Sequence, residues 1–156
     1  PGMMVGPEVE KTAQVRHVSR MFVAAANADM PIFTVVLRKG YGLGALAMAG
    51  GSSLASARIV AWPTGEFGPM GLEGGVKLAY RKEMAAIADP AQRKAWFEAK
   101  VAAEYEKNKA LSSATHLEID DVIDPAETRD RVARLFRSAP PAPTRVGRKR
   151  PGIDPW

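Results

Sequence analysis

Hydrophobic residues follow a helical spacing at the start of the chain and a strand-like run directly after it. Between Glu8 and Asp29, apolar residues recur every three or four positions, as in a long amphipathic helix. The residues that form this stripe are Val18, Met21, Phe22 and Ala25. A proline then ends the pattern, and the near-continuous apolar run Ile32–Leu37 predicts a strand covered on both faces.

Three glycines at alternate positions follow this strand. Gly40, Gly42 and Gly44 predict a glycine-rich turn that leads into a short helix of small residues, Ala45–Gly50. Such a turn at a helix N-terminus directs several free N–H groups into one space and stabilises negative charge there. The charge would belong to a bound phosphate or to an oxygen that becomes anionic during a reaction. The glycines equally fit a tight turn that only lets the helix pack closely against a sheet.

The remainder of the chain alternates between short strands and helices. We expect a strand at Arg58–Trp62, a glycine-rich region at Phe67–Gly75 that continues as a helix to about Tyr80, a helix from Asp89 to about Lys109, a strand at Glu118–Ile123 and a helix at Ala126–Phe136. Asp89-Pro90 and Asp124-Pro125 are strong helix starts, with Asp as the N-cap and Pro at the first helical position. This alternation predicts an α/β fold with parallel strand pairing.

Composition limits the number of domains and the range of partners. A chain of 156 residues has the length of one domain. The net charge of +5 arises largely from the Pro- and Arg-rich stretch 138–156, which we expect to be an extended tail behind the domain of residues 1–137. A short basic run in such a tail is typical of a solvated segment, so we expect no nucleic-acid partner.

Cysteine and membrane signals are both missing from the sequence. With no cysteine, the chain has no disulfide framework and no thiolate nucleophile or ligand. No apolar run approaches the ~20 residues that span a bilayer, and no signal-peptide pattern is present. We therefore expect a cytoplasmic protein of bacterial type, without a membrane partner.

The glycine pattern also satisfies a loose dinucleotide fingerprint. Gly42-x-Gly44-x-x-Ala47 lies between a predicted strand and a predicted helix, as that fingerprint requires. The acidic residue that should end the next strand is absent, because that strand ends in Trp62-Pro63. This departure disfavours a nucleotide-binding α/β domain, which remains the non-enzymatic alternative.

Five segments in order resemble the β (carboxyltransferase) subunits of biotin-dependent acyl-CoA carboxylases, the group that acts on propionyl-, acetyl- and methylcrotonyl-CoA. Arg38–Ala45, R-K-G-Y-G-L-G-A, is similar to the R-K-x-Y-G-G-A segment of that family. The other four are Pro1–Gly6 (similar to P-G-F-x-x-G), Ala61–Thr64, Met70-Gly71 and Asp121–Arg129. The resemblance implies a partial domain of crotonase-like fold (the ClpP/crotonase superfamily, with ββα architecture), about the last third of a full-length subunit.

The resemblance also implies the site residues. In the family, two backbone N–H groups of the Y-G-G-A motif form an oxyanion hole for the ureido oxygen of biotin; here they belong to Leu43 and Gly44, with Leu43 in place of the usual glycine. Positions implied for the biotin pocket are Tyr41, Gly42 and Gly2, and those for the substrate pocket are Leu46, Met70 and Gly71. No side-chain nucleophile or metal is required.

The same resemblance implies cofactors and partners. Carboxyl would pass from carboxybiotin, carried on a partner, to the α-carbon of a short acyl-CoA. The partners implied are a biotin carboxylase or biotin carboxyl carrier subunit and other copies of the carboxyltransferase subunit. Because the acyl-CoA half comes from the other half-domain type, we expect the isolated chain to be inactive.

Other candidate residues support fewer functions. Glu66 and Glu73 lie near the glycine clusters. In the enzymatic alternative, a crotonase-type hydratase or thioesterase, either would be the catalytic acid. We expect structural or pocket-rim roles for both instead. The two histidines, His17 and His116, lack ligand spacing, and Asp120 and Asp121 are expected to serve a turn. Four methionines are expected in the core: Met3, Met4, Met48 and Met70.

Overall fold

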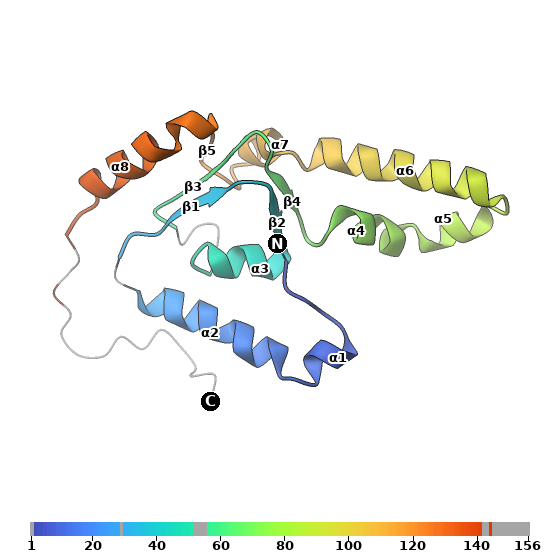
Figure 1. Ribbon diagram of the computed structural model, residues 1–156, viewed down its shortest axis with the longest axis horizontal. Coiled ribbons are helices and arrows are strands. Elements are labelled where there is room, and N and C mark those ends of the chain that lie inside the picture. Colours follow the sequence, from blue (N-terminus) through green and yellow to red (C-terminus); the bar gives the residue numbers. More distant parts are fainter. Residues whose placement is uncertain (1, 29, 52–55, 142–143, 145–156) are drawn as a thin grey trace.

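The computed structural model describes residues 2–28, 30–51, 56–141 and 144, which form an α/β arrangement (Figure 1). The strands are β1 (Phe33–Val36), β2 (Lys39–Tyr41), β3 (Arg58–Ala61), β4 (Glu66–Gly68) and β5 (Asp121–Val122). The α-helices are α1 (Pro7–Glu10), α2 (Gln14–Asn27), α3 (Gly42–Met48), α4 (Leu72–Ala79), α5 (Arg81–Ala86), α6 (Pro90–Lys107), α7 (Ala110–Thr115) and α8 (Thr128–Ser138). A 3₁₀ turn, η1 (Pro125–Glu127), precedes α8.

The strands form two small sheets. One has the order β1-β3-β5 and the other pairs β2 with β4. All three strand pairs are parallel, with Val36 opposite Ala61 in the first sheet and Tyr41 opposite Gly68 in the second. The predicted α/β fold with parallel pairing is therefore confirmed.

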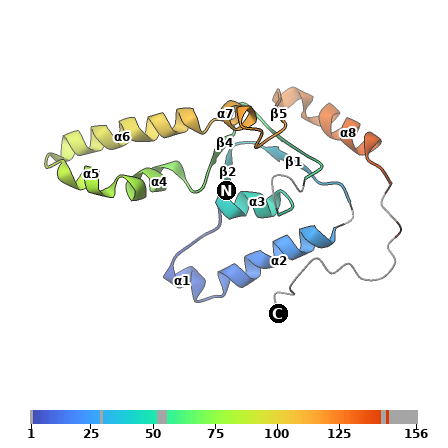
Figure 2. The same ribbon diagram turned by 180° about the vertical axis from the view of Figure 1, so that it is seen from behind.

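The core lies around β3, the central strand of the larger sheet. Ile59, Val60 and Ala61 are all buried, and Ile59 and Ala61 pack with Ala49 after α3 and Ala110 at the start of α7. α3 lies between α2 and the strands in both ribbon views (Figures 1 and 2). The expected strand over Ile32–Leu37 is present as the shorter β1, at the edge of the sheet; its residues are only partly buried, and Leu37 after it is 50% exposed.

Two predicted helices have different bounds. The helix expected over Glu8–Asp29 is broken into α1 and α2, since Ala13 adopts a left-handed conformation with φ 58°. The small-residue helix starts at Gly42, three residues earlier than expected, and the preceding glycine, Gly40, lies inside strand β2. The glycine-rich segment is therefore a strand joined directly to a helix rather than a turn.

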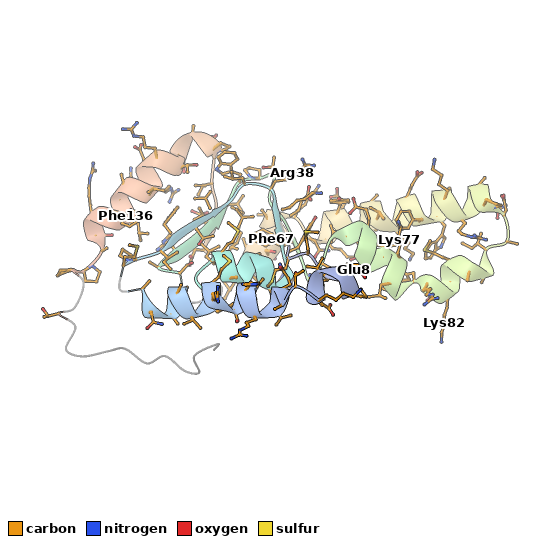
Figure 3. All side chains as sticks on the ribbon, turned by 60° about the horizontal axis from the view of Figure 1, so that its bottom comes forward. Glu8, Arg38, Phe67, Lys77, Lys82 and Phe136 are labelled. Atoms are coloured by element: carbon orange, nitrogen blue, oxygen red, sulfur yellow. The ribbon has the colours of Figure 1, made fainter. Side chains whose placement is uncertain are left out.

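Helices α4, α5 and α6 form an arm that projects away from the sheets (Figure 1). Lys77 and Lys82 lie on this arm (Figure 3). The predicted start of α6 is confirmed, because the Asp89 carboxylate accepts hydrogen bonds from the N–H groups of Ala91 and Gln92 at 3.1 and 3.3 Å. α5 and α7 were not predicted.

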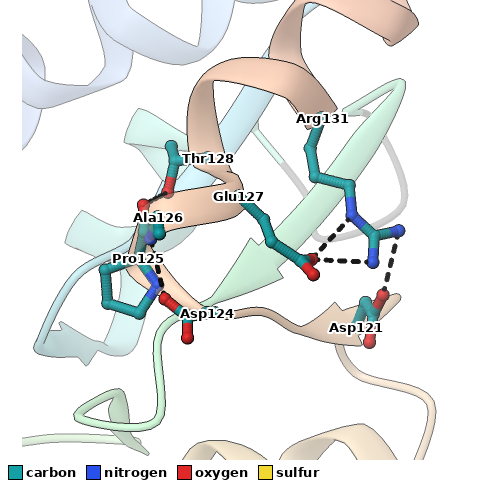
Figure 4. Close-up of polar contacts among 7 residues, drawn as sticks. All are labelled: Asp121, Asp124, Pro125, Ala126, Glu127, Thr128 and Arg131. Atoms are coloured by element: carbon teal, nitrogen blue, oxygen red, sulfur yellow. Dashed lines mark hydrogen bonds and ion pairs between the residues drawn. The ribbon is translucent and has the colours of Figure 1, made fainter.

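Carboxylates cap the 3₁₀ turn η1 before the last helix and pair with an arginine of that helix (Figure 4). Asp124 accepts a 2.8 Å hydrogen bond from the Ala126 N–H, but it caps η1, and α8 starts at Thr128 without a side-chain cap, two residues later than the predicted helix. Arg131 pairs with Glu127 and Asp121 at 3.0 and 3.5 Å. Strand β5 covers only part of the predicted Glu118–Ile123. Most of the expected 138–156 tail lies outside the described residues. Within the described part of the chain, no helix has the length and apolar character needed to cross a membrane.

Candidate functional site

A cavity of about 740 Å³ opens at the start of α3. Its walls are the N-terminal segment, α2, the β2–α3 junction and the loop before α4. Among the site residues implied by sequence, those that line it are Gly2, Tyr41, Gly42, Leu43, Gly44, Met70 and Gly71. Only two of the described residues that line the cavity, Glu10 and Lys39, are charged. The walls are therefore largely apolar and suit a ligand with little charge.

The start of α3 depends on glycine at position 42. Tyr41 is extended (φ −114°, ψ 133°), and Gly42 has φ 56°, a left-handed value that disfavours residues with a Cβ. A Cβ on Gly42 would lie 2.6 Å from the Pro69 carbonyl oxygen. Because the first N–H groups of a helix have no partner one turn earlier, the amides of Leu43 and Gly44 are free of the helical hydrogen-bond ladder.

Gly44 lets the N-terminal segment approach the same turn. It is buried, and a Cβ there would lie 2.8 Å from the Met3 nitrogen and 3.0 Å from the Gly2 carbonyl carbon. Leu43, between the two glycines, is 63% exposed, so a side chain at this position meets no such obstacle. Replacement of the family's usual glycine by Leu43 is thus compatible with the local packing.

Leu46, unlike the other expected site residues, does not line the main cavity. It lines a second cavity of about 420 Å³ together with core residues such as Ile59 and Phe67. Gly42 and Pro69 border both cavities, so the β2–α3 junction lies between them. The structure therefore brings seven of the eight expected site residues to one cavity and places Leu46 at its neighbour.

The two glutamates near the glycine clusters are each bonded to a tyrosine. The Tyr41 hydroxyl donates to Glu66 Oε2 at 2.9 Å, and the Tyr105 hydroxyl donates to Glu73 Oε1 at 2.7 Å. Burial, then the Glu66 hydrogen bond, raises the pKa of Tyr41 above its usual range, while the Tyr105 hydrogen bond lowers the pKa of Glu73. Neither glutamate lines either cavity. Their geometry agrees with structural roles.

Two contributors to this region were missed by sequence reasoning. Lys39 lines the main cavity, and the pairing of Glu66 with Tyr41 joins residues 25 positions apart. Lys39 is part of the R-K-G-Y segment, so its position in that motif was an available signal. The Glu66 contact depends on the pairing of β2 with β4, which no local pattern indicates.

The remaining candidates lie elsewhere. His17 and His116 are exposed, and the described residues contain no group of three His, Cys, Asp or Glu suited to a metal ion. Asp120 accepts a 2.7 Å hydrogen bond from the Ile59 N–H, while Asp121 pairs with Arg131. The expected core positions of three methionines were wrong, since Met4, Met48 and Met70 are 71%, 63% and 42% exposed.

Comparison with known proteins identifies relatives of this region. The chain is 38% identical over 135 residues to the methylmalonyl-CoA carboxyltransferase 12S subunit of Propionibacterium freudenreichii subsp. shermanii, covering 85% of this chain and 25% of the relative. It is 34% identical over 138 residues to a putative propionyl-CoA carboxylase beta chain of Bacillus subtilis, covering 87% of this chain and 26% of the relative. The chain thus spans about a quarter of these relatives rather than the expected third.

Solved structures agree with the sequence relatives. A single-chain, multi-domain long-chain acyl-CoA carboxylase superposes with a TM-score of 0.76 at 53% identity, over 86% of this chain and 13% of the other. A transcarboxylase 12S structure, a hexamer with methylmalonyl-CoA bound, gives 0.75 at 33% identity over 94% of this chain and 29% of the other. Residues 1–150 match the family described as the carboxyl transferase domain. The chain therefore belongs to the carboxyl transferase family and has part of its crotonase-like fold.

Proposed function

We propose that this chain forms the biotin side of the carboxyltransferase site in an acyl-CoA carboxylase. The observation that carries the proposal is the cavity at the start of α3, where five residues of the R-K-G-Y-G-L-G-A segment meet Gly2, Met70 and Gly71. The relatives support it, since they are named as carboxyltransferase or carboxylase subunits.

The walls of this cavity fit a biotin ring system. The ring is nearly uncharged, as are most of the lining residues, and the main-chain amides of Leu43 and Gly44 supply donors for its ureido oxygen. When bound, carboxybiotin would supply the carboxyl group for transfer to the acyl-CoA α-carbon. Tyr41, Gly42 and Gly2 would form the wall beside it.

The chain itself would contribute electrostatic stabilisation. Two backbone amides fixed by a helix start require little reorganisation as an oxygen gains negative charge, and each such donor is worth about 3 kcal/mol of barrier. Glu66 and Glu73, the two residues that sequence offered as a hydratase-type acid, each accept a hydrogen bond from a tyrosine and line neither cavity. Met70 and Gly71 would contact the acyl substrate from the main cavity, and Leu46 from the neighbouring one.

The partners follow from the same proposal. We expect a biotin carboxylase or biotin carboxyl carrier subunit and further copies of the carboxyltransferase subunit, located in the cytoplasm. The 12S relative, which is described as a hexamer in a multienzyme core, supports assembly with other copies. The missing acyl-CoA half would come from the parts of the subunit that this chain does not span.

Carboxyl transfer from methylmalonyl-CoA to free biotin tests the proposal. We expect the 156-residue chain alone to be inactive. A chimera in which it replaces the matching quarter of the 12S relative should transfer carboxyl, with the parent 12S subunit as the positive control. A folded but inactive chimera would contradict the proposed function, and turnover by the isolated chain would contradict the requirement for the missing half.

A further inference from the structure

The buried hydroxyl of Tyr41 connects the two strands beside the cavity. Tyr41 is 5% exposed, and its hydroxyl donates to Glu66 Oε2 at 2.9 Å. In the parallel pairing of β2 with β4, Tyr41 lies opposite Gly68 and Lys39 lies opposite Glu66. The hydrogen bond therefore crosses the small sheet and fixes the ring of the residue that directly precedes α3.

Glu66 is itself held from the strand side. Its backbone N–H donates to the Arg38 carbonyl at 2.6 Å, and its second carboxylate oxygen, Oε1, lies 3.8 Å from Arg38 Nε. The Glu66 side chain is 19% exposed, whereas Arg38 is largely in solvent (Figure 3). A carboxylate restrained in this way offers the Tyr41 hydroxyl one fixed acceptor.

We propose that Glu66, acting through Tyr41, is a positioning residue for the Leu43 and Gly44 amides. Tyr41 is the N-cap residue of α3, so its placement sets the direction of the peptide units that follow. Glu66 lines neither cavity, so its effect on these amides would pass through the Tyr41 hydroxyl. The inference rests on the proposed function, because it assigns these amides to the biotin ureido oxygen.

Kinetics of the 12S chimera test the inference. Tyr41→Phe and Glu66→Leu should lower kcat about 10- to 100-fold, with KM for the acyl-CoA unchanged, because small displacements of aligned groups cost rates of that order. Glu66→Gln keeps an acceptor oxygen and should retain most of the activity. The inference would be overturned if Tyr41→Phe kept full activity while Glu66→Gln was as inactive as Glu66→Leu. That result would assign Glu66 a direct acid–base role.

The exposed arm supplies a matched control. Tyr105→Phe removes a similar tyrosine–glutamate hydrogen bond, of 2.7 Å, between α6 and α4, from a residue that does not line the cavity. We expect the activity of this variant to be unchanged. A loss equal to that of Tyr41→Phe would show that any such bond matters only for folding, and would overturn the inference.

Amide spectra of the 156-residue chain separate this inference from the proposed function. Tyr41→Phe and Glu66→Leu should shift the ¹H–¹⁵N peaks of Leu43 and Gly44, and Tyr105→Phe should leave them in place. Unmoved peaks in both site variants would overturn the positioning contact, whatever the chimera does. If the Leu43 and Gly44 peaks shift in these variants but the wild-type chimera is folded and inactive, the proposed function is refuted. The positioning contact between Tyr41 and Glu66 would still be supported.

Discussion

Replacing Gly42 by alanine should destabilise the chain strongly. Gly42 has φ 56°, and a Cβ there would lie 2.6 Å from the carbonyl oxygen of Pro69. The left-handed conformation costs a residue with a Cβ about 1–2 kcal/mol. Overlap with backbone adds about 1–3 kcal/mol, because backbone cannot move aside as a flexible side chain does. We therefore expect Gly42→Ala to lower the free energy of unfolding by about 2–5 kcal/mol.

Gly74 provides the control for the same substitution. It lies inside α4, is exposed and would place a Cβ in open space. Alanine is favoured over glycine in a helix by about 0.5–1 kcal/mol, so Gly74→Ala should stabilise the chain. Urea unfolding with a constant m-value measures both changes. Equal midpoints for wild type and Gly42→Ala, or equal losses for the two variants, would refute the assigned backbone geometry.

Three further changes test the rest of the fold. Asp89→Ala removes both cap hydrogen bonds of α6 and should cost about 1 kcal/mol in urea unfolding. Trp62→Phe removes the 2.9 Å hydrogen bond from the indole N–H to Thr128 Oγ1 and should cost about 1 kcal/mol, with a lower melting temperature. The pKa of Tyr41 is raised in the folded chain, so this residue stabilises the fold below about pH 10, the ordinary tyrosine pKa. The stabilisation is lost as pH rises through the folded pKa. Tyr41→Phe should therefore reduce the fall in the free energy of unfolding above about pH 10, measured by urea unfolding at several pH values.

Features set by local chemistry were predicted correctly from sequence. The Asp89 and Asp124 caps need only a carboxylate beside free N–H groups, and both are present. Parallel pairing follows from the alternation of strands and helices, which requires crossover connections. The apolar Arg58–Trp62 segment became β3, the central strand, because it can be buried on both sides.

Features without a local sequence signal were not predicted. The break at Ala13 carries neither glycine nor proline, so the sequence gives no local sign of a left-handed residue. Strand β2 has three residues, too few for a periodic pattern, and exists through its pairing with β4. The contact between Glu66 and Tyr41 depends on the same pairing. The misses of β2 and of the Glu66 contact share one cause, since in both the partner lies far away in sequence.

The glycine pattern at the start of α3 has two physical explanations that act together. Gly42 and Gly44 lack a Cβ because Pro69 and the Gly2–Met3 segment approach them within 3 Å of where a Cβ would lie. Those approaches also build the cavity walls around the intervening amides. Close packing at both positions, with the left-handed φ of Gly42, accounts for the two glycines, and the proposed function would use the main-chain amides between them. Leu43 fits this view, because the proposed function would require only its N–H and its side chain is exposed.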